Sequence, residues 1–220
     1  MIRPFREVPS DFLLPRIEPS LRDIERLLER QQKAEALEPL PNPHHEPQVP
    51  DAERESAMPA AVLIALIEHD GPPRVVLTRR HVQIRFGGHI SFPGGRLDPG
   101  ETAIEAALRE SHEEIALQPS EVRVIGRLGD YFTHHGYHIV PVVGVISAHA
   151  QLAPREGEVD EIIEVPLGHF MRPESYRLRQ RSSEPYRANF SVQFEEHHIG
   201  GPTLSILMNL YRMLVEAGVH

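Results

Sequence analysis

The sequence predicts an α/β (α+β) fold in which several strands are combined with a few well-marked helices. Apolar, β-rich runs begin at Ala60 and recur as far as about residue 195. Two segments, 103–117 and 202–217, instead have apolar residues at helical spacing. The chain has 220 residues and is 40% apolar, which is enough for one buried core. We therefore expect a β-sheet packed between helices.

The first 59 residues are expected to form an N-terminal extension to a domain that spans residues 60–220. Ser20 is placed to cap a helix. The apolar residues of this helix fall on one face: Leu21, Ile24, Leu27 and Leu28. Residues 38–59 contain six prolines, a composition typical of a linker or an extended arm. The helix could pack on the domain or on a second subunit, which leaves a homodimer open.

The predicted domain begins with two strands joined by an Asp-Gly-Pro-Pro turn at residues 70–73. A short strand then enters a glycine-rich loop, and more β-rich runs follow the helix at 103–117. The expected strands are residues 60–68, 73–80, 90–92, 122–133, 138–149 and 161–166, with a hairpin formed by 177–181 and 188–195. Pro202 opens a final helix that Gly218 closes, and its apolar residues are expected in the core.

Charge and composition exclude several classes of protein. The net charge of −9 argues against a protein that binds nucleic acid through general attraction to phosphate. The absence of cysteine removes disulfides and thiol chemistry. Histidines cluster at 134–138 and 197–198, but without cysteine or a His-Glu-x-x-His helix they do not predict a zinc site. We find no signal peptide and no apolar run long enough to cross a membrane, so we expect a cytoplasmic protein without membrane partners.

The most informative segment is residues 95–117, GRLDPGETAIEAALRESHEEIAL. Its polar residues follow the spacing G-x5-E-x7-R-E-x2-E-E, formed by Gly95, Glu101, Arg109, Glu110, Glu113 and Glu114. Thr102 and Glu105 have the spacing of a capping box, so a helix should begin at Ala103. Pro119 disfavours helix in the residue before it, so the helix should end near Leu117.

On this helix the carboxylates are expected to lie opposite the core. The stripe predicted to face the core is Ile104, Ala107, Leu108, Ser111 and Ile115. Glu110, Glu113 and Glu114 should fall on the other side, one turn apart. Neighbouring carboxylates raise one another's pKa unless a cation neutralises them. Mg²⁺ binds carboxylates and keeps positions for water and phosphate oxygens. The alternative is a solvated acidic face, which Gly95 and Glu101 at fixed offsets disfavour.

These residues resemble the motif of the Nudix hydrolases, G-x5-E-x7-R-E-U-x-E-E-x-G-U, in which U is a bulky apolar residue. Leu117 matches the last position, whereas Ser111 and Ala116 depart from the motif. The resemblance implies a Nudix-type mixed β-sheet sandwiched between helices. It also implies dependence on Mg²⁺ or Mn²⁺ and cleavage of a nucleoside diphosphate linked to another moiety.

With this resemblance, Glu110 and Glu114 are the first candidates for direct metal ligands, and Glu113 is a third or water-mediated ligand. The backbone carbonyl of Gly95 is a further candidate, since a residue without a side chain allows close approach. Glu101 is expected to hold Arg109 or a metal-bound water rather than to bind metal alone.

The general base is not fixed by the sequence. One candidate lies inside the motif, and Glu158 and Glu161 are others, because family members often take an extra carboxylate from a loop beyond the motif. Glu158 and Glu161 could equally be surface charges. The candidate catalytic residues are thus Arg109, Glu110, Glu113, Glu114 and Glu161.

The segment before the motif bears on the substrate. Residues 76–95, VLTRRHVQIRFGGHISFPGG, resemble the lead-in of the coenzyme A diphosphatase subgroup, L-L-T-x-R-(S/A)-x3-R-x3-G-x3-F-P-G-G. His81 replaces a small residue, and the chain is one residue short between Arg85 and Phe92. The candidate substrate-binding residues are Arg79, Arg80, Arg85 and Gly94. The arginines could meet the extra phosphate of coenzyme A or be ordinary charges at a strand end.

Three functions remain open at this point. The first is hydrolysis of coenzyme A or its derivatives to 3′,5′-ADP and 4′-phosphopantetheine products. The second is hydrolysis of another nucleotide, such as ADP-ribose, a nucleoside triphosphate or a dinucleotide polyphosphate. The third is a nucleotide-sensing module without turnover. The complete acidic set argues against the third function, and the lead-in favours the first over the second.

Overall fold

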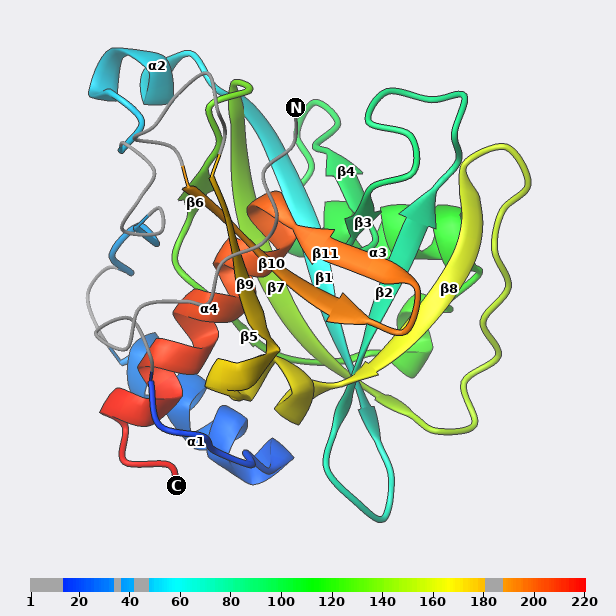
Figure 1. The fold of residues 1–220 in the computed structure, drawn as a ribbon. Coiled ribbons are helices and arrows are strands. Elements are labelled where there is room, and N and C mark those ends of the chain that lie inside the picture. Colours follow the sequence, from blue (N-terminus) through cyan, green and yellow to red (C-terminus); the bar gives the residue numbers. More distant parts are fainter. Residues whose placement is uncertain (1–13, 34–36, 42–47, 181–187) are drawn as a thin grey trace.

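The computed structural model describes residues 14–33, 37–41, 48–180 and 188–220. Within these ranges it confirms the predicted mixed α and β fold (Figure 1). An eight-stranded mixed sheet forms the centre of the molecule, and a three-stranded antiparallel sheet lies beside it. No helix in the described part of the chain is long and apolar enough to cross a membrane.

The elements follow one another in the order drawn in Figure 1. The helices are α1 (Leu21–Gln32), α2 (Asp51–Glu55), α3 (Ala103–Ile115) and α4 (Gly201–Glu216), with 3-10 turns η2 (Pro119–Glu121), η3 (Leu167–Met171) and η4 (Pro173–Ser175). The main sheet contains β1 (Met58–Glu68), β2 (Arg74–Arg80), β3 (Ile90–Ser91), β4 (Gly94–Arg96), β5 (Arg123–Arg127), β6 (Tyr131–Phe132), β7 (Tyr137–Ser147) and β8 (Val159–Pro166). The smaller sheet contains β9 (Tyr176–Gln180), β10 (Ala188–Phe194) and β11 (His197–Gly200).

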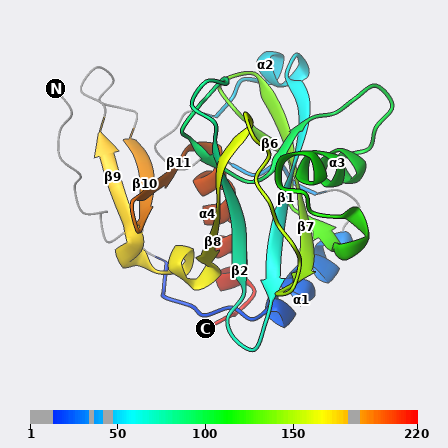
Figure 2. The ribbon, with the colours of Figure 1, turned by 90° about the vertical axis from the view of Figure 1, so that its right-hand side faces the viewer.

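Strand β1 is the centre of the main sheet. It pairs in parallel with β7 along its whole length and antiparallel with β2 and β4. Ile64 and Leu66 point into one core cluster, and Leu63 and Ala65 point into the other. Because both faces are buried, the strand reads as a continuous apolar run rather than an alternation. Figure 2 shows α3 on one side of this sheet and α4 on the other.

Helix α3 begins at Ala103, as predicted, with the Thr102–Glu105 capping box formed. The expected core stripe is correct at Ala107, Ser111 and Ile115, which are buried. It is wrong at Ile104, whose side chain is 44% exposed.

The expectation that Glu114 lies opposite the core is also wrong, because this residue is 5% exposed. The helix ends at Ile115, slightly before the expected Leu117, because Ala116 adopts a left-handed conformation with φ of 57°. That conformation favours glycine, the residue of the family motif at this position.

Helix α1 is part of the core of the same chain. Ser20 and Asp23 form a capping box at its start. Ile24 and Leu28 are almost fully buried in the cluster that contains Ile64 of β1. The helix therefore contacts its own domain rather than leaving its apolar face open, while the division at residues 59 and 60 stays a prediction. Helix α2, in the segment expected to be a linker, was not predicted.

The C-terminal part completes the second face of the sheet. The predicted hairpin is confirmed by antiparallel pairing of β9 with β10, and its connecting residues 181–187 lie outside the described residues. Strands β4 and β11 were not predicted as separate elements. Helix α4 begins one residue before Pro202 and buries Leu204, Leu207 and Leu214 as expected.

Candidate metal and phosphate site

Two adjacent glycines in β4 bring the loop before α3 against the helix. A Cβ atom on Gly94 would lie 2.3 Å from the carbonyl oxygen of Ala61 in β1, and its φ of 152° disfavours other residues. A Cβ atom on Gly95 would lie 2.4 Å from Cδ of Glu110. The Gly-Gly pair therefore lets the backbone reach both the central strand and a carboxylate of α3.

Glu114 is the buried carboxylate of the site. Its Oε2 accepts a hydrogen bond of 3.1 Å from the backbone N–H of Gly94, and Nη1 of Arg80 lies 3.4 Å from Oε1. Burial raises the pKa of Glu114 to about 7, against the opposing effects of Gly94 and Arg80. The charges of Glu110 and Glu158 also contribute to this raised value. An anion in this position is costly unless a cation compensates it.

This burial has a measurable consequence for stability. The pKa of Glu114 rises from 4.5 to about 7 on folding, so the folded protein binds more protons than the unfolded chain between these values. The free energy of unfolding should then fall as pH rises through that window, by about 3 kcal/mol if no metal is bound. Urea unfolding at pH 5 and pH 8 in the presence of a chelator measures it.

The Glu114→Gln variant is the reference for this measurement because glutamine does not titrate. Between pH 5 and pH 8 the free energy of unfolding of the wild type should fall relative to that of the variant. A difference between the two proteins that stays constant with pH would refute the raised pKa.

Arg109 fixes the orientation of two of the acids. Its Nε and Nη2 donate to the two carboxylate oxygens of Glu101 at 2.8 and 3.0 Å. Nη1 donates to Oε1 of Glu110 at 2.9 Å, and Nη2 also donates to the carbonyl oxygen of Arg96 at 3.0 Å. This bidentate arrangement uses the planar guanidinium fully. Arg109 thereby connects the loop after β4 to α3.

The oxygen atoms gathered here fit a hard divalent cation. Burial raises the pKa of Glu110, and Arg109 opposes this effect. Glu113 is more exposed, at 43% of its side chain, and its Oε1 lies 3.7 Å from Nη1 of Arg109. Carboxylates of Glu110 and Glu114, next to the Gly95 backbone, are the oxygen donors that Mg²⁺ and Mn²⁺ prefer. Glu113 lies at the exposed edge of this group.

The two outer carboxylates proposed as bases have different surroundings. Glu158 lies near the end of α3, because its N–H donates to the carbonyl oxygen of Arg155 at 3.2 Å and the N–H of Arg155 donates to that of Glu114 at 2.9 Å. Its charge raises the pKa of both Glu110 and Glu114. Glu161 instead accepts a 3.0 Å hydrogen bond from Nε of Arg79 and lies 3.5 Å from Nε2 of His197.

Glu161, Glu196 and His197 could themselves form a three-ligand metal site away from α3. Glu196 is 77% exposed, and the other two are accounted for by ion pairs. The cluster therefore gives no separate indication of a bound ion.

The three arginines before the motif do not act as a group. Arg79 pairs with Glu161 and with Asp160, while Arg80 pairs with Glu114. Arg85 is exposed and donates to the hydroxyl of Tyr137 at 3.2 Å. Among the described residues Arg85 has no carboxylate partner, so it is the member of the trio with an unneutralised charge.

Residues outside the predicted set also lie near the site. Nδ1 of His81 is 2.5 Å from Oδ1 of Asp160, at the junction of β2 and β8. The guanidinium carbons of Arg85 and Arg96 both lie near the Tyr137 ring, at 5.6 and 5.9 Å from its centroid. These pairings could not be predicted from the sequence, since they join segments whose register is set only by folding.

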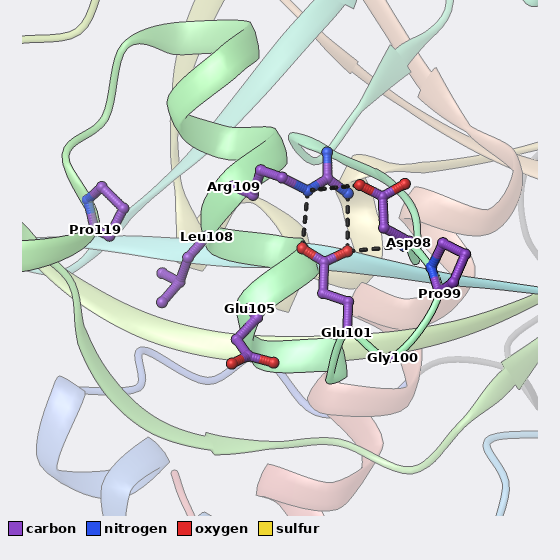
Figure 3. A pocket seen from close by; sticks show the side chains of 8 residues that line it. All are labelled: Asp98, Pro99, Gly100, Glu101, Glu105, Leu108, Arg109 and Pro119. Atoms are coloured by element: carbon purple, nitrogen blue, oxygen red, sulfur yellow. Dashed lines mark hydrogen bonds and ion pairs between the residues drawn. The ribbon is translucent and has the colours of Figure 1, made fainter.

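A pocket of about 570 Å³ opens beside the Glu101–Arg109 ion pair (Figure 3). Its lining residues are Asp98, Pro99, Gly100, Glu101, Glu105, Leu108, Arg109 and Pro119. Glu110, Glu114 and Gly95 do not line it. The pocket therefore adjoins the support of the acidic site rather than its metal-binding oxygens.

A mixed sheet between helices, with an acidic helix facing a Gly-Gly loop, defines the class of α+β protein to which the chain belongs. The chain belongs to the Nudix family, because the family model described as NUDIX domain matches residues 57–189. It is a Nudix hydrolase that acts on phosphoanhydride bonds of nucleoside diphosphate derivatives, and such hydrolases use divalent metals. The family resemblance found in the sequence is thus confirmed.

Two curated relatives are similar over most of their length. The chain is 37% identical to NudL of Pectobacterium atrosepticum, named an uncharacterized Nudix hydrolase, over 69% of this chain and 80% of that protein. It is 33% identical to Nudix hydrolase 3 of Caenorhabditis elegans, over 77% of this chain and 72% of that protein. The crystal structure of RenU, a Nudix hydrolase from M. smegmatis, is 24% identical with a TM-score of 0.42, over 51% of this chain and 73% of that one.

Proposed function

We propose that this protein hydrolyses the diphosphate of coenzyme A or its derivatives, giving 3′,5′-ADP and 4′-phosphopantetheine products. Glu110, Glu114 and the backbone carbonyl of Gly95 would hold Mg²⁺ or Mn²⁺. The burial of Glu114 against the Gly94 amide and Arg80 is the observation that supports the metal assignment. When bound, the ion supplies charge neutralisation at the diphosphate and lowers the pKa of a water ligand.

The chain's own residues prepare the site in three ways. The Gly94 amide fixes one oxygen of Glu114, and Arg109 fixes one oxygen of Glu110. Glu101 holds Arg109 through two hydrogen bonds, so the guanidinium cannot rotate away from Glu110 without breaking them. Such support keeps the ligands in one orientation and lowers the cost of ordering them when a cation arrives.

Glu158 is the better candidate for the general base of the two outer carboxylates. Its charge acts on Glu110 and Glu114, 42% of its side chain is exposed to water, and its ion pair with Nε of Arg155, at 3.5 Å, is longer than that of Glu161 with Arg79. Glu161 is engaged by Arg79 and lies beside His197. A base must first be within reach of the water it deprotonates, and the backbone link from Glu158 through Arg155 to Glu114 favours Glu158 on this criterion.

The choice of coenzyme A rests on the lead-in at residues 76–95 and on Arg85. Coenzyme A carries a 3′-phosphate on its adenosine ribose, which ADP-ribose lacks, and pantetheine in place of the second ribose. The exposed guanidinium of Arg85 has no carboxylate partner among the described residues, and guanidinium groups suit phosphate.

A substrate panel tests this function. With Mn²⁺, kcat/KM should be at least about tenfold higher for coenzyme A than for ADP-ribose or dGTP, because only coenzyme A offers the additional phosphate to Arg85. Mass spectrometry should identify 3′,5′-ADP as a product. Dephospho-coenzyme A, which lacks the 3′-phosphate, is the matched control and should react more slowly. Equal rates on all substrates, or a preference for dGTP, would contradict coenzyme A as the substrate.

A further inference from the structure

A group of rings and guanidinium groups, all exposed except the half-buried Tyr137, lies next to the proposed metal site. Phe86 lies 5.6 Å from the ring of His135, measured between centroids, although the two come from different loops. The guanidinium carbon of Arg85 lies 4.8 Å above the Phe86 ring and 5.6 Å from that of Tyr137. The guanidinium carbon of Arg96 lies 5.9 Å from the centroid of the Tyr137 ring. We call Arg85, Phe86, Arg96, His135 and Tyr137 the aromatic–arginine ledge.

Phe86 is held in an unfavourable backbone conformation. Its φ is 60°, in the left-handed region that bulky residues rarely adopt. Its ring is 37% exposed, so complete burial does not account for this strain. The loop around it is closely folded, since a Cβ atom on Gly87 would lie 2.4 Å from the carbonyl oxygen of Val82. Arg85 lies over this ring and His89 is stacked with it at 6.0 Å between centroids, and the part of this strained residue that stays exposed suggests a ligand contact.

The ledge lies close to the acidic site because both are attached to strand β1. Arg96 follows Gly95 directly, and its carbonyl oxygen accepts a hydrogen bond from Arg109. Arg96 pairs with Ala60 of β1, and Tyr137 pairs with Met58 on the other side of the same strand. The ledge and the Gly95 backbone therefore lie at the same end of β1.

The chemistry of the ledge matches a phosphorylated nucleobase. Aromatic faces stack on bases, and guanidinium groups bind phosphate and also stack on rings. Arg85 and Arg96 have no carboxylate partner among the described residues, so their charge remains available to an anion.

We propose that the ledge binds the purine base of the nucleotide substrate against Phe86 and Tyr137, with a ribose phosphate between Arg85 and Arg96. This inference rests on the proposed function, because it assigns one end of that substrate to the ledge. It adds Phe86, Tyr137 and Arg96 to the residues that determine specificity.

Calorimetric titration of the full chain with 3′,5′-ADP tests the ledge without turnover. The Phe86→Gly variant removes the ring, and glycine accepts the positive φ, so the loop should keep its shape. Its Kd for 3′,5′-ADP should rise about tenfold or more, the loss expected for one base-stacking ring. Val82→Ala, in the same loop and also exposed, is the control and should bind as the wild type does.

The phosphate part of the ledge is tested with Arg96→Gln. This variant should weaken binding of 3′,5′-ADP more than binding of 5′-AMP, because only the first ligand has the additional phosphate. Inorganic pyrophosphate with Mn²⁺ should bind the wild type, Phe86→Gly and Arg96→Gln equally, because it has neither base nor ribose phosphate.

The possible outcomes separate the ledge from the proposed reaction. Unchanged 3′,5′-ADP affinity in Phe86→Gly would overturn the ledge, even if coenzyme A is hydrolysed. Loss of that affinity, in a protein that does not hydrolyse coenzyme A, would support the ledge and remove coenzyme A as the substrate.

Discussion

Replacing Glu114 by glutamine should lower kcat for diphosphate hydrolysis by on the order of a thousandfold, because several kcal/mol of metal-derived stabilisation are lost. Glutamine keeps an oxygen that can accept from the Gly94 amide but lacks the negative charge that a divalent cation requires. The side chain is nearly isosteric, so the fold should be retained. Steady-state kinetics with Mn²⁺, combined with a thermal unfolding curve, measure both quantities.

The matched control for this variant is Glu121→Gln, an exposed carboxylate in η2 just beyond the same helix. Its kcat should equal that of the wild type, because a surface charge away from the site contributes little. If Glu114→Gln retained full activity while Glu121→Gln behaved as expected, the metal role of Glu114 would have to be abandoned.

Replacing Arg109 by lysine should reduce kcat by about one to two orders of magnitude, although the charge is conserved. Lysine has one nitrogen, whereas Arg109 uses three to reach both oxygens of Glu101, Glu110 and the Arg96 carbonyl. We expect Glu110 to lose its fixed rotamer, so that the apparent affinity for Mn²⁺ falls together with kcat. Activity measured against Mn²⁺ concentration would show both effects.

The same substitution in a surface ion pair provides the comparison. Arg127 lies 2.7 Å from Asp130 and is 43% exposed, so Arg127→Lys should leave activity unchanged. Equal effects of the two substitutions would mean that Arg109 is an ordinary surface cation and does not position a ligand.

Local chemical signals made much of the fold predictable. The capping box at Thr102 correctly placed the start of α3, and the apolar run of β1 correctly placed the central strand. These features depend on residues close together in the sequence, so they can be read without knowledge of the fold. The spacing of the acidic motif likewise identified the family, which the family comparison confirmed.

The burial of Glu114 could not be predicted in the same way. Helical periodicity assigns a carboxylate to the solvent face, and here the partners that satisfy it are Gly94 and Arg80 from other elements. Arg79 and Arg80 show a second limit. Successive residues of a strand point to opposite faces, so Arg80 reaches Glu114 while Arg79 pairs with its register partner Glu161. The register of β2 with β8 is not encoded locally.

A crystal structure of the full chain with Mn²⁺ tests the central claim most directly, because an anomalous difference map locates the ion. We expect a peak bound by the carboxylates of Glu110 and Glu114 and by the backbone carbonyl of Gly95. A peak only at Glu161, Glu196 and His197, or no peak beside α3 at saturating Mn²⁺, would contradict the assignment of the acidic helix as the metal site.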